Sequence, residues 1–99
     1  MAPMKHADDM ALEEAIGHLL CPNLSGYEED EIRRLQERDH YGSVFFNTQP
    51  FARWRSAAET VQSVAPWPVI VAADLEFGAR AVADKSVKFP WLMGAAAAD

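Results

Sequence analysis

The sequence predicts an α/β fold in which two parallel strands are joined by a helix. Two apolar runs, Ser43–Asn47 and Val69–Ala73, are separated by an amphipathic stretch. The later run is rich in β-branched residues and ends abruptly at Asp74, which is typical of a parallel strand buried on both faces. A strand, a helix and a second strand in this order form a βαβ unit, whose crossover is right-handed.

A first amphipathic helix is expected near the N-terminus. Asp8 or Asp9 can cap its first turn, and Pro22 ends the helical pattern. The apolar residues that recur at helical spacing between these points are Leu12, Ile16, Leu19 and Leu20. This spacing predicts a helix with one apolar face.

A second helix is expected to begin at a capping box formed by Ser25 and Glu28. Acidic residues crowd its first turn and basic residues follow, which is the charge order that complements the helix dipole. Ile32 and Leu35 face inward in this pattern, and Gly42 is expected to close the helix.

A third helix is expected between the two strands. Residues 47–49 form a turn, Pro50 suits the first helical position, and Pro66 ends the segment. One face carries apolar residues at helical spacing: Phe51, Trp54, Ala58, Val61 and Val64.

Composition limits the class of protein. With 99 residues, the chain holds one small domain at most, and its 49% hydrophobic and 24% charged residues are ordinary for a globular protein. A formal net charge of −6 argues against binding to nucleic acid or to an anionic membrane surface. Neither a signal peptide nor an apolar stretch of about 20 residues is seen, so we expect a cytoplasmic protein that does not enter a membrane.

No metal or cofactor is expected. The single cysteine, Cys21, excludes an internal disulfide framework and is interpreted as a small buried hydrophobic residue. Cys21, His18 and His40 do not have the spacing of a zinc site.

Four segments, in this order, resemble the opening of family 3 glycoside hydrolases, and most closely the bacterial β-N-acetylhexosaminidases. They are Ile16–Leu20, Tyr41–Phe46, Val69–Gly78 and Phe89–Asp99. The resemblance implies that residues 1–99 are the N-terminal, incomplete segment of a (β/α)₈ barrel domain. It also implies a hydrolase that cleaves terminal β-linked sugars, either β-N-acetylhexosaminides or β-glucosides. Two strands alone leave apolar sheet faces uncovered, which likewise indicates a larger fold.

The resemblance also assigns the candidate site. The family's second strand ends in an Asp-Gln-Glu-Gly-Gly-Arg-like motif whose Asp binds hydroxyls of the terminal sugar. Asp74 matches this Asp, and Arg80, one place later than the family's arginine, is the second candidate for substrate binding. Leu75 and Phe77 depart from the motif. The family's nucleophile and acid/base residues follow beyond residue 99, so we expect no catalytic residue and no activity in this segment alone.

Three alternatives stay open. Asp74 and Glu76 are two residues apart, and extended geometry permits them to form the carboxylate pair of a retaining glycosidase. Asp74 can instead be a carboxylate that caps a loop. The whole chain can also be a stand-alone, non-catalytic module that completes its sheet against another chain.

Overall fold

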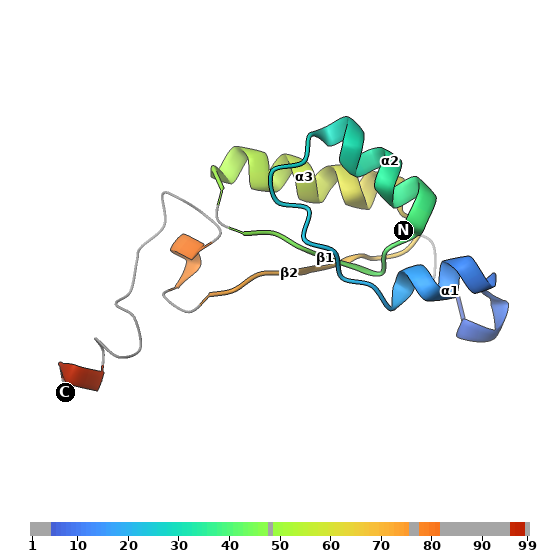
Figure 1. Cartoon of the computed structure of the whole chain (residues 1–99), viewed down its shortest axis with the longest axis horizontal. Coiled ribbons are helices and arrows are strands. Elements are labelled where there is room, and N and C mark those ends of the chain that lie inside the picture. Colours follow the sequence, from blue (N-terminus) through green and yellow to red (C-terminus); the bar gives the residue numbers. More distant parts are fainter. Residues whose placement is uncertain (1–4, 48, 76–77, 82–95, 99) are drawn as a thin grey trace.

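The computed structural model describes residues 5–47, 49–75, 78–81 and 96–98, which form a mixed α/β structure (Figure 1). In chain order the elements are η1 (Ala7–Asp9), α1 (Leu12–His18), α2 (Glu29–Asp39), β1 (Ser43–Phe45), α3 (Phe51–Val64), β2 (Ile70–Ala72) and η2 (Ala79–Ala81). Both predicted strands are present with the predicted helix between them.

β1 and β2 pair in parallel, with Val44 beside Val71, which confirms the βαβ arrangement. The other edge of β1 is occupied by the segment before α2. There the Phe45 N–H donates to the Pro22 carbonyl at 2.9 Å, and the Leu24 N–H donates to the Phe45 carbonyl at 3.0 Å. β1 is therefore hydrogen-bonded along both edges.

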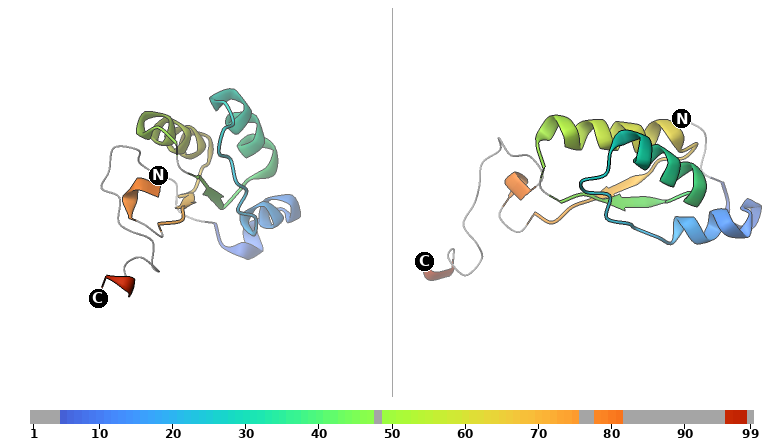
Figure 2. Two further views of the ribbon diagram at one scale, coloured as in Figure 1. Left: turned by 60° about the vertical axis from the view of Figure 1, so that its left-hand side comes forward. Right: turned by 45° about the horizontal axis from the view of Figure 1, so that its top comes forward.

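α2 and α3 lie side by side over one face of this sheet (Figures 1 and 2). The core beneath them consists of Leu24, Ile32, Tyr41, Val44, Phe46, Ala57 and Val61. Val44 in β1 and Phe46, directly after it, have no exposed surface, because alternate residues along this extended segment point toward the helices. Each such side chain contributes roughly 1.5–3 kcal/mol of hydrophobic stabilisation when it is fully buried.

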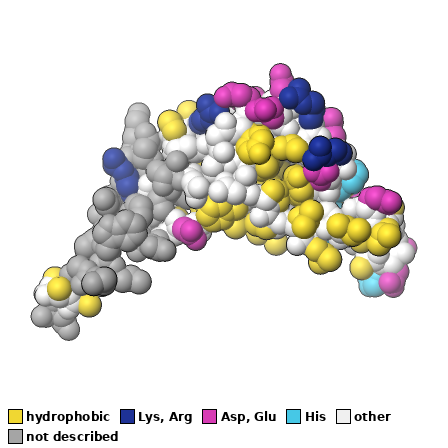
Figure 3. Space-filling model, in the orientation of Figure 1, with side chains coloured by type: hydrophobic (Ala, Val, Ile, Leu, Met, Phe, Trp, Pro, Cys, Tyr) yellow, Lys and Arg dark blue, Asp and Glu magenta, His cyan; other side chains and the backbone are white. Residues whose placement is uncertain are grey.

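The expectation that the second strand is buried on both faces is wrong for the described residues. The side of β2 that carries Ile70 faces away from the helices, and Ile70 is 69% exposed. The reason is that α2 and α3 cover one face of a two-stranded sheet and nothing in the described chain covers the other. Figure 3 shows hydrophobic side chains gathered along the lower side of the molecule.

α1 is shorter than the pattern predicted, and its apolar face is largely exposed. Asp8 and Asp9 lie in the η1 turn, and the N-cap of α1 is Ala11, which makes no side-chain capping bond. Leu12 and Leu19 are exposed, Leu19 to 86%. Only Leu12 and Ile16 of the expected apolar face lie within the helix, because Leu19 is its C-cap and Leu20 follows it. None of these four side chains is buried.

The ends of α2 also differ from the expectation. The capping box is formed by Glu28 and Glu31, and Ser25 instead accepts a hydrogen bond from the Asn47 N–H at 2.6 Å. The chain turns at Gly26, where φ is +80°, so the helix cannot begin at Ser25. At the other end His40, with φ of 56°, takes the left-handed position that was expected of Gly42.

α3 matches its predicted apolar face in part: Val61 is buried and Trp54 and Ala58 pack against the core, but the buried Ala57 and Thr60 were not predicted. Pro50 is the N-cap, one position before the helix, and Phe51 is exposed. Cys21 is exposed as well, contrary to its interpretation as a buried residue. Across the part of the chain that is described, every helix is too short or too polar to traverse a bilayer.

An ionic cluster holds the turn between α2 and β1. The Arg38 guanidinium donates to both carboxylate oxygens of Asp39 at 2.6 Å, and the Tyr41 hydroxyl donates to Asp39 Oδ2 at 2.6 Å. These hydrogen bonds, from Arg38 first and then Tyr41, lower the pKa of Asp39 to about 2. Burial first, and then the contact with Asp39, raises the pKa of Tyr41 to about 12.

We expect Gly17→Ala to destabilise the fold. An added Cβ would lie 1.8 Å from the Asp39 carbonyl oxygen, which belongs to the backbone and cannot turn away. The gain of roughly 0.5–1 kcal/mol that alanine brings to a helix is smaller than the roughly 1–3 kcal/mol cost of overpacking. Urea unfolding should show the loss, with Glu13→Ala in the same helix as the control. An unchanged or more stable Gly17→Ala chain would contradict this close approach.

The Asp39 cluster predicts how stability depends on pH. The folded-state pKa of about 2 lies below the ordinary value of 3.8, so the carboxylate stabilises the fold above that ordinary value. This contribution is lost as the pH falls through about 2. Asp39→Asn should therefore lower the free energy of unfolding near neutral pH and lose its effect in strong acid. Urea unfolding across this range checks it, with the exposed Asp30→Asn as control. If the free energies of unfolding of Asp39→Asn and wild type differed by the same amount at every pH, the lowered pKa of Asp39 would be contradicted.

Candidate functional site

Asp74 lies two residues beyond the end of β2, at the carboxyl end of the parallel sheet, and is exposed. The last hydrogen bond between the strands joins the Phe46 N–H to the Ala72 carbonyl at 3.1 Å. The backbone therefore leaves the sheet just before Asp74. In α/β proteins, this end of the strands is where ligands bind.

The strand alternation identifies the uncovered face of the sheet. Val44 and Val71 are paired, and Val44 is buried under the helices, so Ile70 and Ala72 face the other way. Asp74 follows this strand by two residues, outside the ladder, and is exposed.

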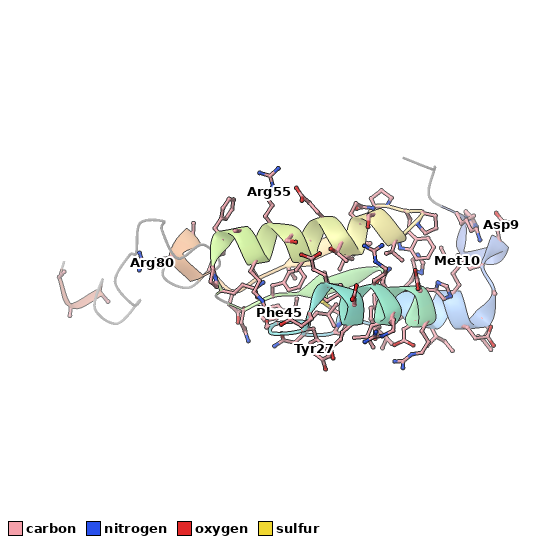
Figure 4. All side chains as sticks on the ribbon, turned by 90° about the horizontal axis from the view of Figure 1, so that it is seen from above. Asp9, Met10, Tyr27, Phe45, Arg55 and Arg80 are labelled. Atoms are coloured by element: carbon pink, nitrogen blue, oxygen red, sulfur yellow. The ribbon has the colours of Figure 1, made fainter. Side chains whose placement is uncertain are left out.

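Arg80 lies in η2, six residues after Asp74, and its side chain is exposed (Figure 4). The chain turns between them at Gly78, where φ is +89° and the N–H donates to the Leu75 carbonyl at 3.0 Å. Both predicted residues therefore follow the carboxyl end of β2. Glu76, the possible partner of Asp74 in a carboxylate pair, lies outside the described residues, as does most of the resembling segment 89–99.

A glutamine that the sequence analysis missed fixes how the chain enters β2. The Gln62 side chain, on α3, donates to the Trp67 carbonyl at 2.8 Å and accepts from the Val69 N–H at 3.0 Å. One amide thus satisfies both backbone groups of the turn that leads into the strand. Gln62 lies four residues after Ala58, on the same face of α3. This spacing could have identified Gln62 from the sequence as a side chain that points toward the sheet.

A second buried amide acts at the start of β1. Gln36 donates to the Tyr41 carbonyl at 3.0 Å, and the Trp67 indole N–H approaches the same oxygen at 3.4 Å. These bonds tie the end of α2 to the turn before β2. The two strands are therefore held in register by buried polar side chains as well as by their own ladder.

The candidate site presents one exposed carboxylate, that of Asp74. An ionised Asp accepts hydrogen bonds only, and its two oxygens can receive two neighbouring hydroxyl groups. The described residues contain no group of three or more side chains suited to holding a metal ion. What the described geometry offers is therefore hydrogen bonding and charge.

No family model matches the chain, and no curated protein matches its sequence.

We expect the Gln62 clamp to stabilise the entry into β2. Gln62→Ala leaves the Trp67 carbonyl and the Val69 N–H without partners, and each unsatisfied buried group costs about 1–3 kcal/mol. Urea unfolding of this variant can be compared with Glu59→Ala on the same helix, which removes only an exposed ion pair with Arg55 worth less than about 1 kcal/mol. Equal losses in the two variants would show that the clamp carries no stability.

Proposed function

We propose that this chain forms part of the sugar-binding pocket of a (β/α)₈-barrel hydrolase of the family 3 glycoside hydrolase type. The enzyme would cleave terminal β-linked sugars, either β-N-acetylhexosaminides or β-glucosides. The observation that carries the proposal is the exposed Asp74 just beyond the carboxyl end of a parallel strand. Carboxylates at this position of a barrel strand face the substrate.

The one-sided cover of the sheet supports a barrel. In such barrels the helices lie outside, and the inner sheet face is buried by side chains from the other strands. Here α2 and α3 cover one face, and Ile70 is exposed on the other. A barrel would place Ile70 in its interior and Asp74 at its mouth.

The open edge of β2 supports the same architecture. Ile70 and Ala72 direct their backbone groups toward β1, as the Ile70 N–H to Gly42 carbonyl bond of 3.1 Å shows. The N–H and C=O of Val71 consequently point to the opposite edge, where the described chain supplies no neighbouring strand. A further parallel strand would satisfy these groups.

In this proposal Asp74 binds substrate and performs no bond cleavage. Each charge-assisted hydrogen bond from a sugar hydroxyl contributes about 1.5–3 kcal/mol, and such contacts strengthen toward the transition state. Arg80 is the second candidate contact, reaching the substrate from the η2 turn. The nucleophile and the acid belong to other parts of the enzyme.

A second candidate function uses the same open surface. The exposed face of Ile70 and the free edge at Val71 also suit a non-catalytic module that completes its sheet against another chain. In that case Asp74 would have no sugar to bind. Its substitution would leave pairing with the other chain intact.

Substitution of Asp74 in the hydrolase that contains this segment tests the proposal. We expect Asp74→Ala to lower kcat/KM on the order of a hundredfold, which corresponds to a loss of about 3 kcal/mol in transition-state stabilisation. Asp74→Asn should lower kcat/KM somewhat less. The fold should survive because the side chain is exposed. The exposed Glu59→Gln, far along α3, is the matched control and should keep full activity.

Deoxy analogues of the substrate separate binding from structure. Wild type should discriminate strongly against the sugar that lacks the contacted hydroxyl, and Asp74→Ala should hardly discriminate. If the variant unfolds, or discriminates as wild type does, Asp74 is a loop cap. If no β-glycosidase activity accompanies the segment, the interaction module is favoured.

A further inference from the structure

A hollow of about 330 Å³ lies along α2. Tyr27, in the segment just before the helix, forms one wall, and the other lining residues are Glu31, Arg34, Leu35 and Arg38. Their spacing of three and four residues places these four on one side of the helix. The volume lies at the lower end of the range of roughly 300–1,000 Å³ found for small-molecule pockets. None of the five residues belongs to the proposed sugar site.

The Arg34 guanidinium has no partner in the described chain. Arg34 is exposed, and it takes part in no ion pair or hydrogen bond with a described residue. Arginine stays charged at physiological pH, and its planar group carries five N–H donors in a fork that matches a carboxylate. Arg34 therefore presents an uncompensated positive charge and a complete set of donors to the hollow.

Arg38, one turn further along α2, adds donors that are already oriented. Its Nε and Nη2 groups each donate to the Asp39 carboxylate at 2.6 Å. The two N–H groups of Nη1 take no part in these bonds and make no other hydrogen bond within the described residues. Because Asp39 holds one side of the guanidinium, less conformational entropy is lost when the other side binds a ligand.

The charge of the hollow favours an anion. Two guanidinium groups line it against one carboxylate, that of Glu31. Glu31 Oε2 accepts a hydrogen bond from the Glu28 N–H at 3.0 Å, so this carboxylate is engaged at the start of the helix. The hollow is thus a local positive site on a chain whose formal net charge is −6.

The other two walls are apolar and aromatic. Leu35 is partly buried against the core, and Tyr27 is 43% exposed. Aromatic rings attract one another in offset-stacked or edge-to-face arrangements and bury a large apolar area. A flat apolar ligand can therefore contact both side chains while its anionic group reaches the arginines.

The surroundings of the hollow disfavour larger or purely polar anions. An acidic peptide or a nucleic acid would extend onto the first turn of α2, where Glu29 and Asp30 would repel it. Inorganic phosphate would bind the guanidinium groups but leave Tyr27 and Leu35 without a contact. A small ligand with one carboxylate and one ring uses all of these side chains at once.

We propose that this hollow binds a small aromatic carboxylate. The carboxylate accepts hydrogen bonds from Arg34 and from Nη1 of Arg38, and the ring lies against Tyr27 and Leu35. This binding is independent of Asp74, which follows β2.

The test is an NMR titration of the full ¹⁵N-labelled chain with sodium phenylacetate at pH 7 and constant ionic strength. We expect saturable shifts of the amide signals of residues 27–38, with a Kd on the order of 1 mM because exposed ion pairs are weak. Acetate lacks the ring and benzyl alcohol lacks the charge, so each should bind at least about tenfold more weakly.

Two pairs of variants test the individual contacts. Arg34→Gln should weaken phenylacetate binding about fivefold. Arg33→Gln removes the same charge from the neighbouring exposed position and should bind as wild type does. Tyr27→Ala should weaken binding, whereas Tyr27→Phe should preserve it because the ring remains. Circular dichroism verifies that the variants are folded, and Arg34→Lys, which lacks the planar fork, replaces Arg34→Gln if that variant is not.

The proposal is overturned if wild type shows no saturable shifts, or if acetate or benzyl alcohol binds as tightly as phenylacetate. Equal binding by Arg34→Gln and Arg33→Gln would overturn it as well, because the charge at the hollow would then be irrelevant. So would equal binding by Tyr27→Ala and Tyr27→Phe, because the ring would then contribute nothing.

Discussion

The complete burial of Val44 and Phe46 under α2 and α3 is the constraint on which the rest of the structure depends. Because side chains alternate along a strand, the face that carries these two residues packs against the helices, and Phe45 points to the other side. β2 follows β1 in register, so Ile70 falls on the face without helices. The exposure of Ile70 is therefore a direct result of where the core lies.

The two ends of the sheet have different chemical characters. At the carboxyl end the chain leaves β2 just before an exposed carboxylate, Asp74. At the amino end two helices terminate beside Gln36 and Trp67, close to Glu14 and Glu37.

Two amide side chains, the buried Gln36 and the half-buried Gln62, give this small sheet part of its order. Two strands of three residues each supply few ladder bonds, and isolated two-stranded sheets are marginal in water. Gln36 and Gln62 add hydrogen bonds to the backbone around Tyr41 and Trp67, outside the strands themselves. The edge of β2 and the side that carries Ile70 remain uncovered by the described chain, and both proposed functions rest on these features.

The sequence by itself determined the order of elements, the parallel pairing and the position of Asp74 after the second strand, because hydrophobic periodicity and proline placement report local structure directly. It also predicted that Val61 lies on the inward face of α3, but not that Ala57 and Thr60 are buried there. Tertiary structure decided the rest: the burial of Gln36, the left-handed turn at His40 and the exposure of Leu19. A periodic pattern shows which residues share a face, but whether that face is covered depends on segments distant in the chain. Those contacts decide burial, and with it which polar side chains become part of a site.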